Sequence, residues 1–337
     1  MAFQIRTESR ATQGGWDGTV FLLEDDVGTN RALIWPAFGF NCCSWQVMRR
    51  GQMLDLLYAD PQLFNDSKPT RSGIPILFPF PNRIRDGRFV WEGKEYRLPL
   101  NDSTGKNAIH GFPCRKPWRV VAQGADAHSA WLTGEFRASV DAPEALPLWP
   151  ADYRLRVTYR LSAAHLWIEA EVQNSDRWTL PFGLGYHPYF RTPFVPGGNA
   201  ASCLAQAPAA SYWELQDSLP TGQRLPVDVA RDLDVPRACG ELSLDDILTR
   251  LPITAVKGLC LRGVVQDPKA GAALRVSTSP DFRELVAFTP ANRQAICLEP
   301  YTCTTDAINL QQRGIDAGLL VLPPGETWRG VVELGVE

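Results

Sequence analysis

The 337-residue sequence has little of several features that would mark a specialised class of protein. Its formal net charge is only −3, from 34 basic and 37 acidic residues, so no strong electrostatic field favours a nucleic acid or an anionic membrane as partner. No apolar run is long enough to span a membrane, and the first residues lack the apolar stretch of a secretory signal. We therefore expect no nucleic-acid or membrane partner.

The eight cysteines also lack the spacings that carry a known role. No Cys-x-x-Cys pair occurs, and no spacing is typical of zinc ligands. Without an export signal, reduced thiols in a cytoplasm are a better interpretation than a disulfide framework. No segment offers a site for a nucleotide. We accordingly expect a cytoplasmic protein that uses neither a metal ion nor an organic cofactor.

Helical periodicity is scarce, whereas the alternation typical of strands is clear. Residues 46–58 are ambiguous, because their apolar residues fit neither period and Gly51 interrupts them. Residues 154–161 alternate apolar and polar side chains, residues 166–173 repeat the pattern, and the short connection predicts an antiparallel hairpin. Further strands are expected at residues 89–91, 96–98, 130–136, 259–265, 273–278, 285–289, 295–298, 318–322 and 328–334.

Twenty-seven glycines and twenty-seven prolines are dispersed along the chain and separate many short strands. No repeat of fixed period and no low-complexity linker divides the sequence. Residues 193–209 and 220–236 are long, polar and poor in strand signals, so we interpret them as surface loops or lids. The sequence predicts an all-β fold, a large antiparallel β-sandwich with few short helices, in which residues 1–337 form one domain.

Two of the four histidines, and one glutamate, stand in short motifs rich in glycine, proline and aromatic residues. An imidazole can protonate an oxygen near neutral pH, and a carboxylate can accept a hydroxyl proton. A cyclic aldose opens when its ring oxygen gains a proton while its C1 hydroxyl loses one, which requires one acid and one base. The motifs are Pro81-Asn82-Arg83-Ile84, Asn107-Ala108-Ile109-His110-Gly111-Phe112, Gly185-Tyr186-His187-Pro188-Tyr189-Phe190 and Leu298-Glu299-Pro300-Tyr301-Thr302.

Each of these residues also has an ordinary structural interpretation. His187 could be a core histidine satisfied by a backbone carbonyl, and His110 could cap a loop. Glu299 could be a half-buried carboxylate with a raised pKa, or the first residue of a loop after its strand. Arg83 could be half of a structural salt bridge. The functional interpretation therefore depends on the four motifs together.

Taken together and in this order, the motifs resemble the aldose 1-epimerase (galactose mutarotase-like) family, and the resemblance spans roughly residues 73–309. It implies a large, single-domain antiparallel β-sandwich, the galactose mutarotase-like supersandwich, with the site in an open cleft on one sheet. The implied activity is exchange of the α and β anomers of a monosaccharide, with no cofactor and no metal. A monomer and a homodimer are equally compatible with the sequence.

The resemblance also implies roles for individual residues. His187 would be the general acid that protonates the ring oxygen, and Glu299 the general base that takes the C1 hydroxyl proton. Arg83 and His110 would bind and orient the sugar. The sugar-binding aspartate of the family falls on Asp245, with Asp246 as the alternative.

The sequence departs from the galactose-specific pattern of this family in two places. Phe112 follows Gly111 where a second glycine is usual, and Pro300-Tyr301-Thr302 replaces the usual glutamine-containing segment. The proton-transfer groups remain, but galactose is not implied as the substrate. Three cations near the motifs could meet the phosphate or sulfonate of an acidic sugar, namely Arg85, Arg115 and Lys116.

Two alternatives remain open. A catalytically inactive carbohydrate-binding or regulatory protein could keep the same cleft, although the presence of both His187 and Glu299 argues against it. A glycosidase could pair Glu299 with Asp245, but this hypothesis leaves both motif histidines without a role.

Overall fold

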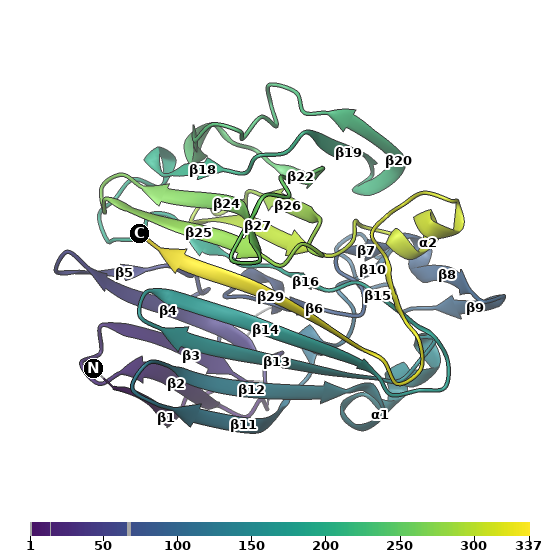
Figure 1. Ribbon diagram of the computed structural model, residues 1–337, viewed down its shortest axis with the longest axis horizontal. Coiled ribbons are helices and arrows are strands. Elements are labelled where there is room, and N and C mark those ends of the chain that lie inside the picture. The colour runs from purple at the N-terminus through teal and green to yellow at the C-terminus, as the bar shows by residue number, and fades with distance from the viewer. Residues whose placement is uncertain (1, 14, 66–68) are drawn as a thin grey trace.

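The computed structural model describes residues 2–13, 15–65 and 69–337, and these residues form a fold built mainly of β-strands (Figure 1). The strands make a ten-stranded, an eight-stranded and a five-stranded sheet, together with three two-stranded ribbons. The long strands pair antiparallel with their neighbours. The prediction of an all-β, antiparallel fold is confirmed.

The ten-stranded sheet contains the longest strands and runs through the middle of the view in Figure 1. In order across the sheet its strands are β11 (Arg119–Ala125), β12 (Ala130–Arg137), β13 (Tyr153–Ser162), β14 (His165–Asn174), β29 (Thr327–Val336), β25 (Ala272–Thr278), β24 (Leu259–Asp267), β18 (Leu204–Gln206) and β21 (Arg237–Ala238), with β23 (Ala255–Val256) paired to β24.

The hairpin predicted from residues 154–173 is part of this sheet. β13 and β14 pair along their whole length, from Tyr153 opposite Asn174 to Ser162 opposite His165. Every second residue of β13 is buried, because successive side chains of a strand point to opposite faces. The other face, which includes the arginines of β13, is partly exposed. The alternation in the sequence therefore identified both the strands and the face that packs inward.

The eight-stranded sheet carries most of the residues considered below. In order across the sheet its strands are β20 (Leu219–Pro226), β19 (Ser211–Gln216), β22 (Asp245–Thr249), β26 (Glu284–Phe288), β27 (Ala295–Tyr301), β16 (Gly185–Tyr186) and β6 (Ile76–Leu77), with β17 (Phe190–Arg191) paired to β27.

The five-stranded sheet is formed by the N-terminal part of the chain. Its strands follow chain order, and two of them account for most of the ambiguous segment 46–58. Arg50 and Gly51 make the turn between these two strands, both with positive φ, which explains the interrupted pattern. The strands are β1 (Phe3–Ser9), β2 (Thr19–Asp25), β3 (Asn30–Trp35), β4 (Asn41–Arg49) and β5 (Gln52–Asp55).

The main hydrophobic core joins all three large sheets. One cluster of buried residues includes Ala32 of β3, Tyr159 of β13 and Leu298 of β27. β3 contacts β13, and Gly263 of β24 lies against the side chain of Leu298. Burial of apolar area between stacked sheets supplies the main favourable free energy of such a sandwich, at about 25 cal/mol per Å².

Two of the ribbons and the helix α2 lie together at one end of the sandwich, on the right in Figure 1. The ribbons are β7 (Arg83–Ile84) with β10 (Ala108–Ile109), β8 (Arg88–Trp91) with β9 (Lys94–Arg97), and β15 (Leu180–Phe182) with β28 (Leu320–Leu322). The helices are α1 (Ala138–Asp141), α2 (Ala307–Gln312), and the 3₁₀ turns η1 (Pro69–Arg71), η2 (Arg85–Gly87), η3 (Pro113–Arg115), η4 (Pro143–Leu148), η5 (Ala200–Ser202) and η6 (Cys239–Glu241).

Two segments predicted as surface loops contain strands, so that prediction was wrong in part. Residues 193–209 include β18, which lies inside the ten-stranded sheet, and Phe194 and Val195 are buried. Residues 220–236 include most of β20, an edge strand of the eight-stranded sheet that contains two prolines. β18 pairs with two strands that lie further along the chain, whereas β20 forms a hairpin with the preceding strand β19.

Among the described residues, no helix combines the length and the apolar composition that crossing a membrane requires.

Candidate active site

Glu299 lies inside a strand that is buried along its whole length. β27 extends to Tyr301, beyond the predicted residues 295–298. Strand alternation places Cys297, Glu299 and Tyr301 on one face, while Leu298 points to the other face and into the main core. The Glu299 carboxyl therefore projects from the side of the eight-stranded sheet that faces away from β24.

The short strand β16 brings His187 beside Glu299. Gly185 pairs with Leu77 of β6 on one side and with Tyr301 of β27 on the other. The chain then continues directly to His187, whose Nδ1 lies 3.4 Å from Oε1 of Glu299. The two residues expected to transfer protons are thus neighbours in space.

A hydrogen-bond chain determines which nitrogen of His187 carries its hydrogen. The Tyr189 hydroxyl donates to the carbonyl oxygen of Thr70 and lies 3.3 Å from Nε2 of His187. Because the hydroxyl hydrogen is committed to Thr70, Tyr189 accepts a hydrogen bond from Nε2–H. The Tyr189 ring also stacks on the imidazole, with centroids 4.6 Å apart. Nδ1 therefore presents its lone pair toward Glu299.

His110 lies close to His187, with ring centroids 5.8 Å apart. Its backbone N–H donates to the carbonyl of Asn82, and its Nδ1 accepts from the backbone N–H of Asn82 at 3.2 Å. His110 and Gly111 both have positive φ, and a Cβ on Gly111 would lie 1.8 Å from the Phe78 carbonyl oxygen. The loop-capping interpretation of His110 is thus correct, and the same loop places the imidazole at the site.

Arg83 also combines a structural contact with a place at the site. Its Nη1 donates to Oδ1 of Asn82 at 3.0 Å, and its Nε lies 3.4 Å from Oδ2 of Asp102. The guanidinium is close enough to His110 and Asp245 to lower the pKa of both groups. For His110 this effect adds to that of burial, whereas for Asp245 burial raises the pKa and Arg83 opposes it. The salt bridge anticipated from the sequence is present, and Arg83 still faces the cluster.

Asp245, rather than Asp246, faces the site. Asp245 is paired with Phe288, which is paired with Cys297, so Asp245 lies on the same sheet face as Glu299. Partial burial raises the pKa of the Asp245 carboxyl, and the charge of Asp246 adds to this effect. Asp246 points away and accepts a 2.6 Å hydrogen bond from Arg231. All five residues expected at the site are thus gathered around one sheet face.

Burial shifts the protonation of the central pair in opposite directions. It lowers the pKa of His187 to about 3 and raises the pKa of Glu299 well above its ordinary value. Burial likewise lowers the pKa of His110 far below its usual range, helped by the charges of His187, Arg115 and Arg83. Burial therefore favours the neutral form of each group, with the proton that the pair can exchange on Glu299 rather than on His187.

The pair is more enclosed than the open cleft that the resemblance implies. His187 is 7% exposed and Glu299 only 2%, whereas Asp245 is exposed. The low exposure follows from the position of Glu299 within a buried strand and from the rings of Tyr189 and Phe288 against His187. Solvent contact is small but present on the His187 side.

Of the three cations singled out near the motifs, two have carboxylate partners. Arg85 lies 3.7 Å from Asp306, and Lys116 lies 2.5 Å from Glu144. Arg115 makes no ion pair within the described part of the chain, and its buried Nε has no hydrogen-bond partner there. Its charge contributes to the lowered pKa of His110, so this cation faces the site.

One group of donor atoms at the site has a spacing that could hold a metal ion. The ligand atoms of His187, Cys297 and Glu299 lie within 4.8 Å of one another. Burial raises the pKa of both the Cys297 thiol and the Glu299 carboxyl, and so favours the protonated form of both groups. Because a protonated thiol and a protonated carboxyl are poor ligands, we assign no metal to this group.

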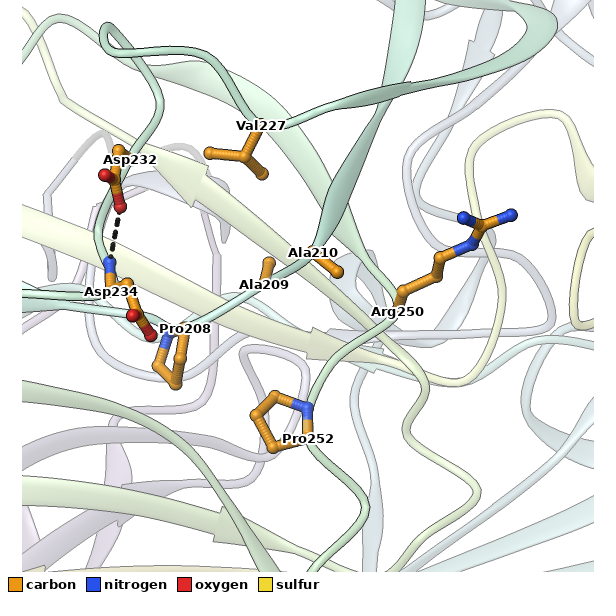
Figure 2. A pocket seen from close by; sticks show the side chains of 8 residues that line it. All are labelled: Pro208, Ala209, Ala210, Val227, Asp232, Asp234, Arg250 and Pro252. Carbon is orange, nitrogen blue, oxygen red and sulfur yellow. Dashed lines mark hydrogen bonds between the residues drawn. The ribbon is translucent and has the colours of Figure 1, made fainter.

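A separate pocket of about 460 Å³ lies away from these residues (Figure 2). The Asp232 carboxylate in its wall accepts a hydrogen bond from the backbone of Asp234, and Arg250 points away from both. No charged groups converge in this pocket, and we assign it no role. Its lining consists of Pro208, Ala209, Ala210, Val227, Asp232, Asp234, Arg250 and Pro252.

Comparisons with known proteins identify the family of this chain. A family model described as aldose 1-epimerase matches residues 29–335. The chain belongs to the aldose 1-epimerase family.

Two relatives and one solved structure illustrate the similarity of this aldose 1-epimerase family member to other proteins. The uncharacterised protein YphB of Escherichia coli K12 is 28% identical over 271 residues, which cover 77% of this chain and 82% of YphB. Galactose mutarotase of Mus musculus is 32% identical over 167 residues, which cover 47% of this chain and 44% of the mouse protein. A galactose mutarotase-like protein from Clostridium acetobutylicum shares the fold, with a TM-score of 0.85 and 24% sequence identity. The superposition covers 100% of this chain and 99% of the Clostridium chain.

Three further residues of this family member were not singled out from the sequence as parts of the site. Tyr189 holds the His187 ring, Phe288 contacts it edge-on, and Tyr301 donates a 2.6 Å hydrogen bond to Oε2 of Glu299. Tyr189 lies two residues after His187, and Tyr301 lies two residues after Glu299. That spacing on a strand is the signal that could have indicated a shared face.

Proposed function

We propose that the protein catalyses the interconversion of the α and β anomers of an aldose by general acid and base catalysis. His187 protonates the ring oxygen while Glu299 takes the proton of the C1 hydroxyl, and the ring opens to the aldehyde. After rotation about the C1–C2 bond, the reverse transfers close the ring on either face. The catalysed reaction is therefore an isomerisation with no net consumption of protons.

The observation that carries this proposal is the separation of 3.4 Å between His187 Nδ1 and Glu299 Oε1. The ring oxygen and the C1 hydroxyl are bonded to the same carbon, so an acid and a base that serve both must also lie close together. An inactive binding protein would need neither group. A glycosidase that used Glu299 with Asp245 would leave His187 without a function.

One proton shared by the pair is sufficient for this cycle. Burial favours the arrangement in which that proton is on Glu299 and His187 is neutral. Its transfer to His187 yields an imidazolium and a carboxylate with the same total charge, which is the state that opens the cyclic sugar. Opening returns His187 to its neutral form and Glu299 to its protonated form. While the open-chain sugar is bound, His187 and Glu299 are therefore in the protonation states that burial favours.

Three side chains around the pair supply the hydrogen bonds that would orient the sugar. His110 borders His187, Arg83 lies near His110 and Asp245, and Asp245 stands at the exposed side of the same sheet face as Glu299. Arg83 offers donors and Asp245 offers acceptors to the hydroxyls of a pyranose. Positioning of this kind lowers the entropic barrier of the proton transfers.

Polarimetry tests the proposal directly. Freshly dissolved α-glucose and α-galactose should reach anomeric equilibrium faster with the protein than without it, after subtraction of the uncatalysed rate. Release of reducing ends from an aryl glycoside would instead indicate a glycosidase. Binding of sugars without acceleration would indicate an inactive carbohydrate-binding protein and would contradict the proposal.

A sugar with an anionic substituent is a second candidate substrate, supported by Arg115. This cation has a buried Nε without a hydrogen-bond partner among the described residues, and its charge reaches His110. A phosphate or sulfonate would satisfy such a group with charge-assisted hydrogen bonds. A panel of neutral, phosphorylated and sulfonated aldoses, compared by kcat/KM, separates this candidate from a neutral substrate.

A further inference from the structure

Tyr301 contacts the carboxyl of Glu299 through a short hydrogen bond. Its hydroxyl donates to Oε2 at 2.6 Å, and both residues are almost completely buried. Since Oε2 is engaged, the other oxygen, Oε1, is the one that lies toward His187. The two oxygens of this carboxyl therefore have different neighbours and different freedom to react.

The Tyr301 ring is fixed by its surroundings. It belongs to a buried cluster on the site side of the eight-stranded sheet, with Leu77, Trp213 and Val286. A Cβ on Gly185 would lie only 2.5 Å from Cδ1 of the ring, so the glycine of the histidine motif leaves the space that the ring fills. A ring held in this way has little rotational freedom, and its hydroxyl stays on Oε2.

We propose that Tyr301 is a positioning residue for the reaction described above: its hydroxyl holds the Glu299 carboxyl so that Oε1 is presented to the C1 hydroxyl of the sugar. This inference rests on the proposed function of Glu299. Tyr301 itself touches neither His187 nor the reacting atoms of the sugar in this arrangement.

The same hydrogen bond adjusts the charge of Glu299. Burial raises the pKa of Glu299, the Tyr301 hydrogen bond lowers it, and the negative charge of Asp245 raises it again. Loss of the hydroxyl would remove the lowering contribution and make the carboxylate harder to form. The titratable groups that face Glu299 from all packed elements are His187, Tyr189, Asp245, Cys297 and Tyr301.

The decisive comparison is between Tyr301→Phe and Tyr186→Phe. Both changes remove one buried hydroxyl, but the hydroxyl of Tyr186 has no hydrogen-bond partner among the described residues. In Tyr301→Phe we expect kcat to fall about tenfold, the value of a hydrogen bond to a charged group, with little change in KM. The alkaline limb of the rate profile should move to higher pH. Tyr186→Phe should show neither effect.

A measurement that needs no turnover separates this inference from the proposed function. The infrared absorption of protonated carboxyl groups, followed across pH and assigned with Glu299→Gln, reports the titration of Glu299 directly. We expect this titration to move to higher pH in Tyr301→Phe and to stay in place in Tyr186→Phe. An unchanged titration in Tyr301→Phe would overturn the role of Tyr301. If the wild-type protein did not accelerate mutarotation above the uncatalysed rate, the proposed function itself would be contradicted.

A thermodynamic cycle covers the case in which Tyr301→Phe folds poorly. The free energies of unfolding of Tyr301→Phe, Glu299→Ala and the double variant give the coupling between the two side chains, because alanine offers no oxygen to the tyrosine hydroxyl. We expect the tyrosine substitution to cost less stability when Glu299 is already alanine. Additive effects would contradict a direct interaction and overturn the assignment.

Discussion

Gly185 and Tyr301 are opposite each other in the pairing of β16 with β27, and the tyrosine ring occupies the space where a side chain on Gly185 would begin. This contact joins the motif that contains His187 to the strand that contains Glu299. The separation of the two proton-transfer groups therefore depends on a residue with no side chain.

Gly185→Ala should consequently disturb the site as well as the fold. The added Cβ would lie 2.5 Å from the Tyr301 ring, closer than a van der Waals contact allows. We expect a loss of about 1–3 kcal/mol in the free energy of unfolding, as for other overpacked positions, and a slower mutarotation. Chemical denaturation and polarimetry measure the two effects. Wild-type stability in this variant would show that the ring moves aside without cost.

His187→Asn and Glu299→Gln should each reduce the rate of anomer exchange by at least ~10², the lower end for loss of a general acid or base. Both substitutions nearly preserve the size of the side chain, so sugar binding should change much less. Polarimetry and calorimetric titration with the same sugar provide the rate and the affinity. Full activity of both variants against several sugars would contradict the assigned roles.

The rate should vary little with pH over a wide range. Below about pH 3, the pKa of His187, the pair gains a second proton and no base remains. At high pH the pair loses its one proton, but the raised pKa of Glu299 delays this loss well beyond the ordinary range of a carboxyl group. Stopped-flow polarimetry across pH, corrected for buffer catalysis, measures the profile. A large change of rate near pH 6.5 would indicate an imidazole with an ordinary pKa instead.

Glu284 should make the stability of the protein depend on pH. This carboxyl is fully buried, accepts a 3.0 Å hydrogen bond from Trp213 Nε1, and has a pKa raised by burial from 4.5 to about 7. Between pH 4.5 and about pH 7, the folded state therefore binds more protons than the unfolded state. The free energy of unfolding should fall by up to about 3 kcal/mol as pH rises through this window. Denaturation of Glu284→Gln should lack this component, and an identical slope in both proteins would contradict the prediction.

Arg115 and Lys116 form a matched pair of cations for testing the anionic-substrate hypothesis. Lys116 already pairs with Glu144, whereas Arg115 has no ion pair within the described residues. If the sugar carries a phosphate or sulfonate, Arg115→Leu should raise KM for that sugar by about tenfold or more, and Lys116→Leu should leave it unchanged. Neutral aldoses should show no difference between the two variants. If Arg115→Leu and Lys116→Leu had equal KM values for every sugar, the anionic-substrate hypothesis would be contradicted and a neutral aldose would remain as the substrate.

The sequence predicted those parts of the fold in which one strand face is buried and the other is partly exposed. The hairpin of β13 and β14 is the clearest case, because its alternation reports burial directly. β18 was missed because its three residues are stabilised by strands distant in the sequence, and β20 was missed because glycine and proline interrupt its pattern. The end of β27 was missed because buried Glu299, Pro300 and Tyr301 carry no apolar period.

Motif order and the family resemblance indicated the five candidate residues that lie near one another in the structure, but not the relationships among them. The choice of Asp245 over Asp246 depends on strand register and on the partner that Arg231 offers to Asp246. The opposite pKa shifts of His187 and Glu299 depend on burial, which no short motif reports. The contact of Tyr301 with Glu299 requires the strand to continue past residue 298.

The place of β29 has a consequence for biogenesis. This strand lies between β14 and β25 rather than at the border of its sheet. Until residues 327–336 leave the ribosome, both neighbours keep an open row of backbone donors and acceptors able to recruit other chains. A nascent or truncated polypeptide ending before residue 327 should therefore self-associate readily and depend on chaperones, although it already contains every side chain of the proposed active site.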